Sequence, residues 1–303
     1  MGIVLRSEPQ VTNPVLLAAW PGIGNIGLIA IDTLRVALQA EEFGDIEPWE
    51  FFYPKRLLIR SGILEHLEFP SNKFYWARTG ARDLLFFIGE EQPANRGRMY
   101  AEGRQAYRMA NLVLDVAARF GCRRVYTSGA AVALTHHTIK PRVWAVPNHA
   151  RLIQEVKEHE NTVLMSDIEE GSGQGNITGL NGLLLGVAGK RGVEGVCMMG
   201  EIPTYLQGVP LPYPKASKSV IEALTRTLGI EVNLAALDDM IQSIEARIEE
   251  FYQQIPPDMK DMLERLKNVA YSRPSEPGPI TEDDKKKIME DIDQLFKQQG
   301  GHD

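Results

Sequence analysis

The sequence of 303 residues predicts an α/β protein with a largely parallel sheet, an antiparallel excursion near residues 45–80 and a helical appendage at the C-terminal end. Short apolar runs alternate with segments in which apolar residues recur at helical spacing, which is the pattern of strands alternating with helices. Three of the apolar runs end in a glycine followed by polar, acidic or small residues. From residue 233 onward the strand-like runs stop, and acidic helical repeats replace them.

The first unit, residues 15–38, combines a strand, a tight turn and a helix. The apolar run 15–20 predicts a buried strand, Pro21-Gly22 breaks it, and helical spacing follows over 26–38. Gly22, Gly24 and Gly27 spell G-x-G-x-x-G at the start of this helix. Backbone N–H groups at such a position can bind an anion. The turn is therefore either an anion site or a close-packed strand–helix connection.

The next segments predict the antiparallel excursion. Residues 41–54 are expected to form a twisted or edge strand with loops, and the short segments 55–60, 63–69 and 73–78 an antiparallel meander or edge hairpin. The later expected strands are 83–88, 124–128, 143–146, 162–165 and 194–199. The expected helices are 99–120, 148–159 with Asn148 as N-cap, 180–190 and 217–228, with Gly121 and Gly229 as C-caps.

The predicted organisation has four parts. Residues 1–232 form the α/β domain, and residues 233–270 form a helical hairpin whose apolar stripe either packs on the domain or lies between subunits. Residues 271–280 form a Pro/Ser/Gly linker. Residues 281–303 carry a final amphipathic helix, which Thr281 is expected to cap.

Composition excludes several classes of function. The net charge of −7 gives no electrostatic case for binding nucleic acid or an anionic membrane. Cys122 and Cys197 have no metal-ligand spacing, and we expect both to be small buried hydrophobes in a reducing compartment. No secretion signal or membrane-spanning run is seen, so we expect a cytoplasmic protein. His136, His137 and His149 lack partners at a recognisable spacing, so no metal and no cofactor is expected.

Polar residues at the strand ends form the candidate binding rim. Ligands of open parallel sheets bind at the carboxyl ends of the strands. The candidate residues are Gly22, Gly24, Asn25, Gly27, Glu90, Glu91, Gln92 and Glu201. The acids among them are candidates for metal binding or acid–base work, and no catalytic residue is assigned. Alternatively, these acids cap the following helices or pair with Arg96, Arg98 and Arg104.

A dinucleotide site is the weaker interpretation of the glycine run. The acid of such a site ends a second apolar strand, and neither Asp45 nor Glu47 does so. Pro21 also occupies a position where the tight turn usually needs a free N–H. Neither a P-loop nor a G-x-S-x-G motif occurs in the chain.

Several motifs together resemble one family. These motifs are PGIGNIG (21–27), GEEQP (89–93), GNITGLNGLLL (175–185), GVCMMGEIPTYL (195–206) and LGIEVNLAAL (228–237). They are similar to those of proteasome assembly chaperone 2 and its archaeal and bacterial relatives, over residues 15–237. The resemblance implies a phosphorylase/hydrolase-like mixed sheet flanked by helices, homo-oligomers, and proteasome α subunits as partners. The end of the chain, Gly301-His302-Asp303, departs from the hydrophobic-Tyr-any motif with which some members dock.

Two hypotheses follow. In the first, the chain is a homo-oligomer that acts through protein contacts, as an assembly chaperone or a scaffold, with itself and another protein as partners. In the alternative, it is an enzyme or binds a small molecule or nucleotide in a cleft at the strand ends. A binder needs the strand-end acids to face an open pocket. A scaffold needs those groups to be satisfied already by the protein.

Overall fold

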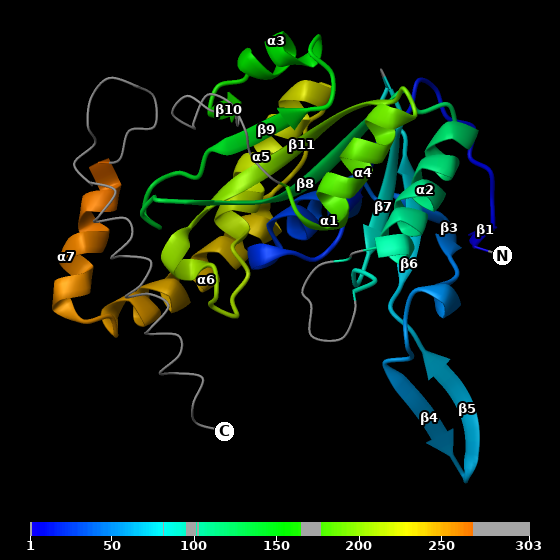
Figure 1. Ribbon diagram of the computed structural model, residues 1–303, viewed down its shortest axis with the longest axis horizontal. Helices are drawn as coiled ribbons and strands as arrows, with labels where there is room; N and C mark the ends of the chain where they lie inside the picture. The colour runs from blue at the N-terminus through cyan, green and yellow to red at the C-terminus, as the bar shows by residue number, and fades with distance from the viewer. Residues whose placement is uncertain (1, 81, 95–100, 102, 165–176, 269–303) are drawn as a thin grey trace.

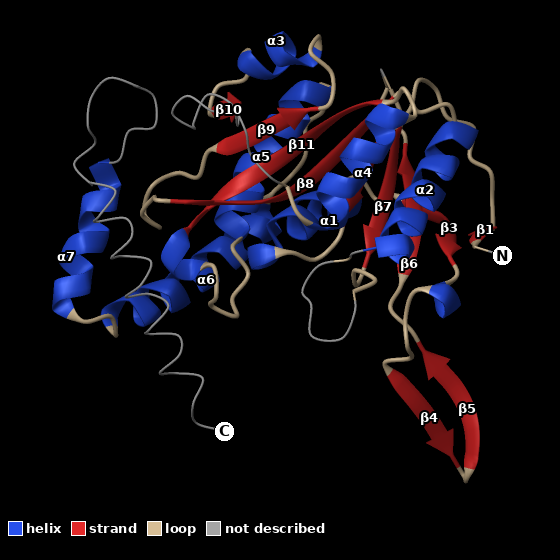
Figure 2. Ribbon diagram, in the orientation of Figure 1, coloured by secondary structure: helices blue, strands red, loops and turns tan. Residues whose placement is uncertain are grey.

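The structure, a computed structural model, describes residues 2–80, 82–94, 101, 103–164 and 177–268. A nine-stranded mixed sheet lies between two layers of helices, as Figures 1 and 2 show. The expected mixed sheet flanked by helices is therefore confirmed. The strands of this sheet are β1 (Ile3–Leu5), β2 (Val15–Ala19), β3 (Glu41–Ile46), β6 (Asn72–Ala77), β7 (Leu84–Gly89), β8 (Arg124–Ala133), β9 (Val143–Pro147), β10 (Thr162–Leu164) and β11 (Glu194–Pro203).

The centre of the sheet is parallel and its two flanks are antiparallel. The spatial order is β1-β3-β6-β7-β2-β8-β11-β9-β10. The four central strands, β7, β2, β8 and β11, run parallel, so their carboxyl ends meet at one edge. Strand β9 runs antiparallel to β11, with Val143 opposite Gly200, so β9 and its parallel neighbour β10 begin at that same edge.

The antiparallel flank differs from the expectation in two ways. Strand β3 is an interior strand rather than an edge strand, because β1 pairs with its outer side. Strands β4 (Arg56–Arg60) and β5 (Ile63–Glu68) form a separate two-stranded sheet, which projects from the body in Figure 1, whereas β6 joins the main sheet. Pairing partners far apart in the sequence decide these differences.

The helices cover both faces of the sheet. They are α1 (Ile26–Ala37), α2 (Gly103–Arg119), α3 (Leu152–Lys157), α4 (Gly179–Lys190), α5 (Pro214–Leu228), α6 (Ala235–Gln253) and α7 (Pro257–Arg265). Alternate side chains of β2 serve the two faces: Leu17 belongs to the hydrophobic cluster of α1 and α5, and Leu16 to that of α2 and α4. This two-residue alternation gives the centre of the sheet two buried faces.

The expected helix 148–159 is only partly formed, and the expected cap at Asn148 is wrong. Helix α3 begins at Leu152, preceded by Arg151 as its N-cap residue. The Asn148 amide instead donates to the carbonyl oxygens of Leu185 and Val193 and accepts from the N–H of Gly195 at 2.8 Å. Asn148 therefore joins β9 to β11 and α4, a tertiary role that local sequence cannot indicate.

The two C-terminal helices pack on the α/β core. Leu237 and Ile248 of α6 and Leu263 of α7 are buried in the same hydrophobic cluster as α1 and α5. Lys218 of α5 pairs with Asp238 of α6 at 2.6 Å. The expected linker 271–280 and final helix 281–303 lie outside the described residues, as do residues 99, 100 and 102 of the expected helix 99–120 and residue 165 of the expected strand 162–165. Within the described ranges, every helix is too short or too polar to cross a bilayer.

Histidine and tyrosine rings join this helical pair to the core. The rings of His136 and His137 lie 4.2 Å apart between centroids, and the ring of Tyr252 from α6 lies 5.3 and 4.8 Å from them. The His137 Nδ1 is 2.6 Å from the Tyr205 hydroxyl, and Glu264 of α7 accepts a hydrogen bond from Tyr252. Both histidines are buried, so this pair belongs to an internal contact between α6, α7 and the core.

The free energy of unfolding is expected to fall as pH falls from about 6.5 to about 4. Burial, with the charges of His137 and Lys267, lowers the pKa of His136 from 6.5 to about 4, and burial lowers that of His137. In this window the unfolded chain binds more protons than the folded protein, so protonation favours unfolding. The contribution of His136 is about 3 kcal/mol between these limits.

Urea unfolding at a series of pH values measures the slope of the free energy of unfolding against pH. The variant His136→Gln should lose most of it, and His66→Gln, which changes an exposed histidine of β5, should keep it. An unchanged slope in His136→Gln would contradict the assignment, whatever the stability of that variant at pH 7.

Candidate functional site

The loop after β2 occupies the centre of the carboxyl-end edge. Gly22 has an extended backbone, with φ at −160°, and its carbonyl accepts the N–H of Asn25 at 2.9 Å. Gly24 and Asn25 both have left-handed backbones, with φ at 59° and 50°. The Asn25 side chain is exposed and makes no capping bond to α1. The four candidate residues of this loop therefore serve a tight strand–helix connection.

Two glycines allow the helices to approach the sheet closely. A Cβ atom at Gly27 would overlap the backbone carbonyl of Ser128 in β8, so α1 lies directly on that strand. A Cβ at Gly200 in β11 would lie 2.9 Å from the carbonyl oxygen of Ala216 in α5. The Ser217 hydroxyl then donates to the carbonyl of Ile26 at 3.0 Å, which ties α5 to α1. Glycine is required at both positions because a side chain would overlap a neighbouring backbone, and this packing explains the two glycines without a bound phosphate.

The Gln92 side chain holds three segments together at the edge. Its Nε2 donates to the carbonyl of Pro21 at 2.7 Å. Its Oε1 accepts the N–H groups of Leu180, at the start of α4, and of Ala101. The side-chain donor and the acceptor of this amide are thus both engaged. Gln92 positions the loop after β2 against the N-terminus of α4.

A small cavity lies beside Gln92. Its volume is about 90 Å³, and Gly22, Gly129, Asn181 and Met199 are among the residues that line it. Ligand pockets for cofactor-sized molecules measure roughly 300–1,000 Å³, so a dinucleotide does not fit. The Cys197 thiol also faces this cavity, and burial raises its pKa to about 11, so it stays protonated at neutral pH. Of the candidate rim residues, Gly22 and Gln92 line this space.

Glu90 and Glu91 lie at the base of the β4–β5 hairpin. Lys55 forms ion pairs with both carboxylates, at 3.6 Å from Glu91, and Glu90 also accepts the N–H of Ser71 at 2.8 Å. Burial alone would raise the pKa of Glu90, but these hydrogen bonds outweigh it and hold that pKa below its usual range. Their ion-pair partner is Lys55, which the sequence did not indicate. These carboxylates anchor the hairpin.

Glu201 is buried at the other side of the edge. Only 1% of its surface is exposed, and its carboxylate accepts hydrogen bonds from the Arg142 backbone, the Arg142 guanidinium and the Trp144 indole at 2.7–3.0 Å. A buried carboxylate with this many donors is stably held. The partners of Glu201 lie in β9 and the loop before it, whereas Glu90 and Glu91 pair with Lys55, so these acids are held by separate groups.

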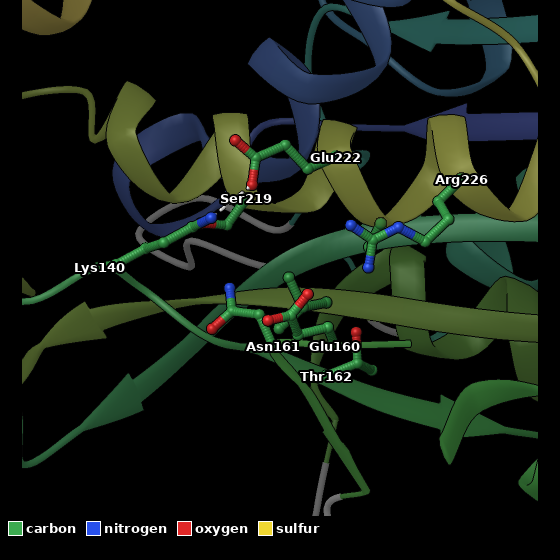
Figure 3. A pocket seen from close by; sticks show the side chains of 9 residues that line it. Lys140, Glu160, Asn161, Thr162, Ser219, Glu222 and Arg226 are labelled. Atoms are coloured by element: carbon green, nitrogen blue, oxygen red, sulfur yellow. Dashed lines mark ion pairs between the residues drawn. The ribbon is translucent and has the colours of Figure 1, made fainter. Parts of the chain in front are cut away.

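A larger cavity lies between α5 and the turn before β10, at the same edge of the sheet. Its volume is about 270 Å³, and Figure 3 shows charged side chains from both walls. Lys140, Glu160 and Arg226 line it, and none of them was a candidate. They belong to three separate segments without a shared motif, so the sequence carried no signal for them.

The β4–β5 hairpin exposes large apolar side chains. Ile59 and Ile63 are each 67% exposed, and Leu57 and Leu64 about half. An isolated two-stranded hairpin is marginally stable in water, and exposed apolar clusters commonly mark contact sites. We refer to residues 56–68 as the arm. The sequence predicted a hairpin here but carried no signal of its isolation from the main sheet.

Comparisons with known proteins agree on one family. The sequence profile of the PAC2 family matches residues 16–252. An uncharacterized protein of Methanocaldococcus jannaschii is 26% identical over 269 residues, which cover 88% of this chain and 90% of that protein. The crystal structure of Pyrococcus furiosus PbaB, an archaeal proteasome activator, is 28% identical with a TM-score of 0.68 and covers 82% of this chain and 97% of its own. PbaA of the same organism, a homologue of proteasome-assembly chaperone, shares the fold at 21% identity and a TM-score of 0.58, covering 83% and 96% of the two chains.

The packing role of the glycine run predicts a contrast between two substitutions. Gly27→Ala should lower the free energy of unfolding by about 2–3 kcal/mol, because the new methyl group meets the Ser128 backbone. Gly22→Ala should change it by less than about 0.5 kcal/mol, because no atom lies within 4 Å of a Cβ there and its backbone is extended. Urea unfolding of the two variants checks this, and equal stabilities would refute the packing role.

Proposed function

This chain belongs to the PAC2 family, and from that membership we propose that it acts through protein–protein contacts, as an assembly chaperone or oligomeric scaffold. The relatives point to proteasome subunits as the class of partner, since PbaB is described as a proteasome activator. The exposed arm is the observation that supports a contact function most directly. We place this activity in the cytoplasm.

The enzyme alternative finds little support in the described residues. Catalysis by paired carboxylates requires the acids to converge on an open site. Glu90 and Glu91 pair with Lys55 at the base of the arm, and Glu201 is buried against Arg142. The strand-end acids are already satisfied by protein groups, as a scaffold requires.

We propose that the arm joins copies of this chain into a homo-oligomer. Its charges are balanced internally, because Arg56 lies 3.7 Å from Glu68 and Arg60 lies 3.5 Å from Glu65. The arm therefore presents apolar surface without a net charge that would select a charged partner. Such a surface suits a symmetric contact with the same patch on a second copy. The anchor at Lys55 and Glu90 fixes the direction in which the arm projects.

Substitutions on the arm test the homo-oligomer. Ile59→Lys and Ile63→Lys should each weaken self-association by about tenfold or more, because a charge then lies in the apolar contact. The free energy of unfolding should stay within about 0.5 kcal/mol of wild type, because both side chains are exposed. Analytical ultracentrifugation over a concentration series gives the association constant.

The matched control is Val36→Lys, which adds the same charge to a valine of α1 that is 57% exposed and far from the arm in sequence. This variant should associate as wild type does. A wild-type chain that remains monomeric at all concentrations, or arm variants of unchanged mass, would rule out the arm as the self-association surface.

Binding to proteasome α subunits tests the class of partner. The wild-type chain should bind purified α subunits from the same organism and raise the yield of assembled rings. Biolayer interferometry measures the binding, and native gels measure assembly. No complex at concentrations of about 10 μM would contradict the proteasome assignment while leaving a scaffold for other proteins. Binding without a gain in assembly would identify a scaffold rather than a chaperone.

A further inference from the structure

The cavity of about 270 Å³ between α5 and the turn before β10 is lined by one positive and one negative side chain on each of its two walls. Figure 3 shows Arg226 reaching from α5 toward the opposite wall, Glu222 running along the helix toward Lys140, and Glu160, Asn161 and Thr162 on the opposite wall. Residues 222 and 226 are four apart, so they lie on one face of the helix. The cavity belongs to the carboxyl-end edge, because it reaches Val143 at the start of β9.

The protein holds the two walls apart at a fixed spacing. At one end, Lys140 forms an ion pair with Glu222 at 2.8 Å, drawn as a dashed line in Figure 3. Next to Arg226, the Thr227 hydroxyl lies 2.9 Å from Nε2 of His159, which precedes Glu160. These two contacts link α5 to both segments of the opposite wall. The cavity is thus formed in the protein without a ligand.

The turn that carries Glu160 is itself rigid. Asn161 has a left-handed backbone with φ at 64°. Its Nδ2 donates to the Pro141 carbonyl at 2.9 Å, and its carbonyl accepts the N–H of Val143 at 3.0 Å. Thr162 then begins β10. The contacts of Asn161 therefore set the position of the Glu160 backbone, and the two side-chain contacts above link this turn and Lys140 to α5.

Two charges in this cavity have no ion-pair partner among the described residues. Arg226 and Glu160 line the same space from opposite walls, and both are exposed to solvent at its mouth. Neither lies within 4.0 Å of an opposite charge in the part of the chain that the structure describes. The buried hydroxyl of Thr162, which also lines the cavity, has no hydrogen-bond partner among the described residues. Lys140 and Glu222 neutralise each other. What remains unmatched is one cation and one anion.

We propose that this cavity binds a small zwitterion, a molecule that carries both a carboxylate and an ammonium group, as a free amino acid does. The carboxylate pairs with the Arg226 guanidinium, whose planar fork suits a bidentate carboxylate. The ammonium group pairs with Glu160. A volume of about 270 Å³ equals that of roughly nine waters, which is enough for an amino acid of about ten heavy atoms.

Ligands with a single charge fit this cavity less well. Because Lys140 and Glu222 neutralise each other, a simple anion would gain Arg226 but would face Glu160, and a simple cation would gain Glu160 but would face Arg226. The charge of such a ligand is repelled by the side chain of like charge on the other wall. A zwitterion matches both walls at once. The proposed site is independent of the arm and of the proteasome assignment.

Thermal unfolding of the full-length protein with the twenty amino acids, each at about 20 mM, tests the proposal, because a ligand of the folded state raises the melting temperature. We expect at least one amino acid to bind. Isothermal titration with that amino acid should show Arg226→Gln and Glu160→Gln each weakening affinity by about tenfold or more. The absence of a shift with every amino acid would overturn the proposal.

Matched controls separate this site from general charge effects. Arg247→Gln and Glu158→Gln remove the same charges from exposed positions that do not line the cavity, and both should bind as wild type does. Acetate and methylammonium serve as half-ligands: Arg226→Gln should weaken only acetate, and Glu160→Gln only methylammonium. Inorganic phosphate that binds more tightly than any amino acid, and still more tightly to Glu160→Gln, would instead identify a simple anion site.

Discussion

The close approach of α1 and α5 to the central strands is the constraint on which the rest of the structure depends. At Gly27 the helix backbone touches the backbone of Ser128, and at Gly200 the strand touches Ala216 of α5. Because glycine leaves no side chain between these backbones, helices and sheet pack at a spacing that any larger residue would increase. This spacing determines where the loop after β2 lies, and through Gln92 it determines where α4 begins.

The polar side chains described at the carboxyl-end edge mostly form hydrogen bonds or ion pairs with other parts of the protein. Gln92 links three segments, Glu90 anchors the arm, and Glu201 is buried under donors from β9 and the loop before it. Burying a polar group without a hydrogen-bond partner costs free energy, so these groups are paired within the protein. Few polar side chains among the described residues therefore remain available to a ligand at the centre of the edge. Open surface remains at the periphery: the apolar arm on one side and the charged cavity beside α5 on the other.

The sequence predicted what depends on local pattern and missed what depends on distant partners. The apolar alternation and glycine breaks located β2, α1 and α5, and the parallel centre predicted a shared edge near Gly22 and Gln92. The pairing of β1 with β3, the isolation of the arm and the role of Asn148 each require a contact far along the chain. Glu201 and Arg226 illustrate the same limit at the site, because the direction of a strand-end or helix side chain depends on which element packs beside it.

Helix α5 is where the separate parts of the molecule meet. One side of it packs on β11 at Gly200, another faces the cavity with Arg226, and Lys218 pairs with Asp238 of α6. The arm lies at the opposite end of the molecule from α7, as Figure 1 shows. Within one copy of the chain, the arm is therefore on a different part of the surface from α7. The proposed self-association through the arm and the proposed ligand binding beside α5 therefore use different surfaces of the molecule.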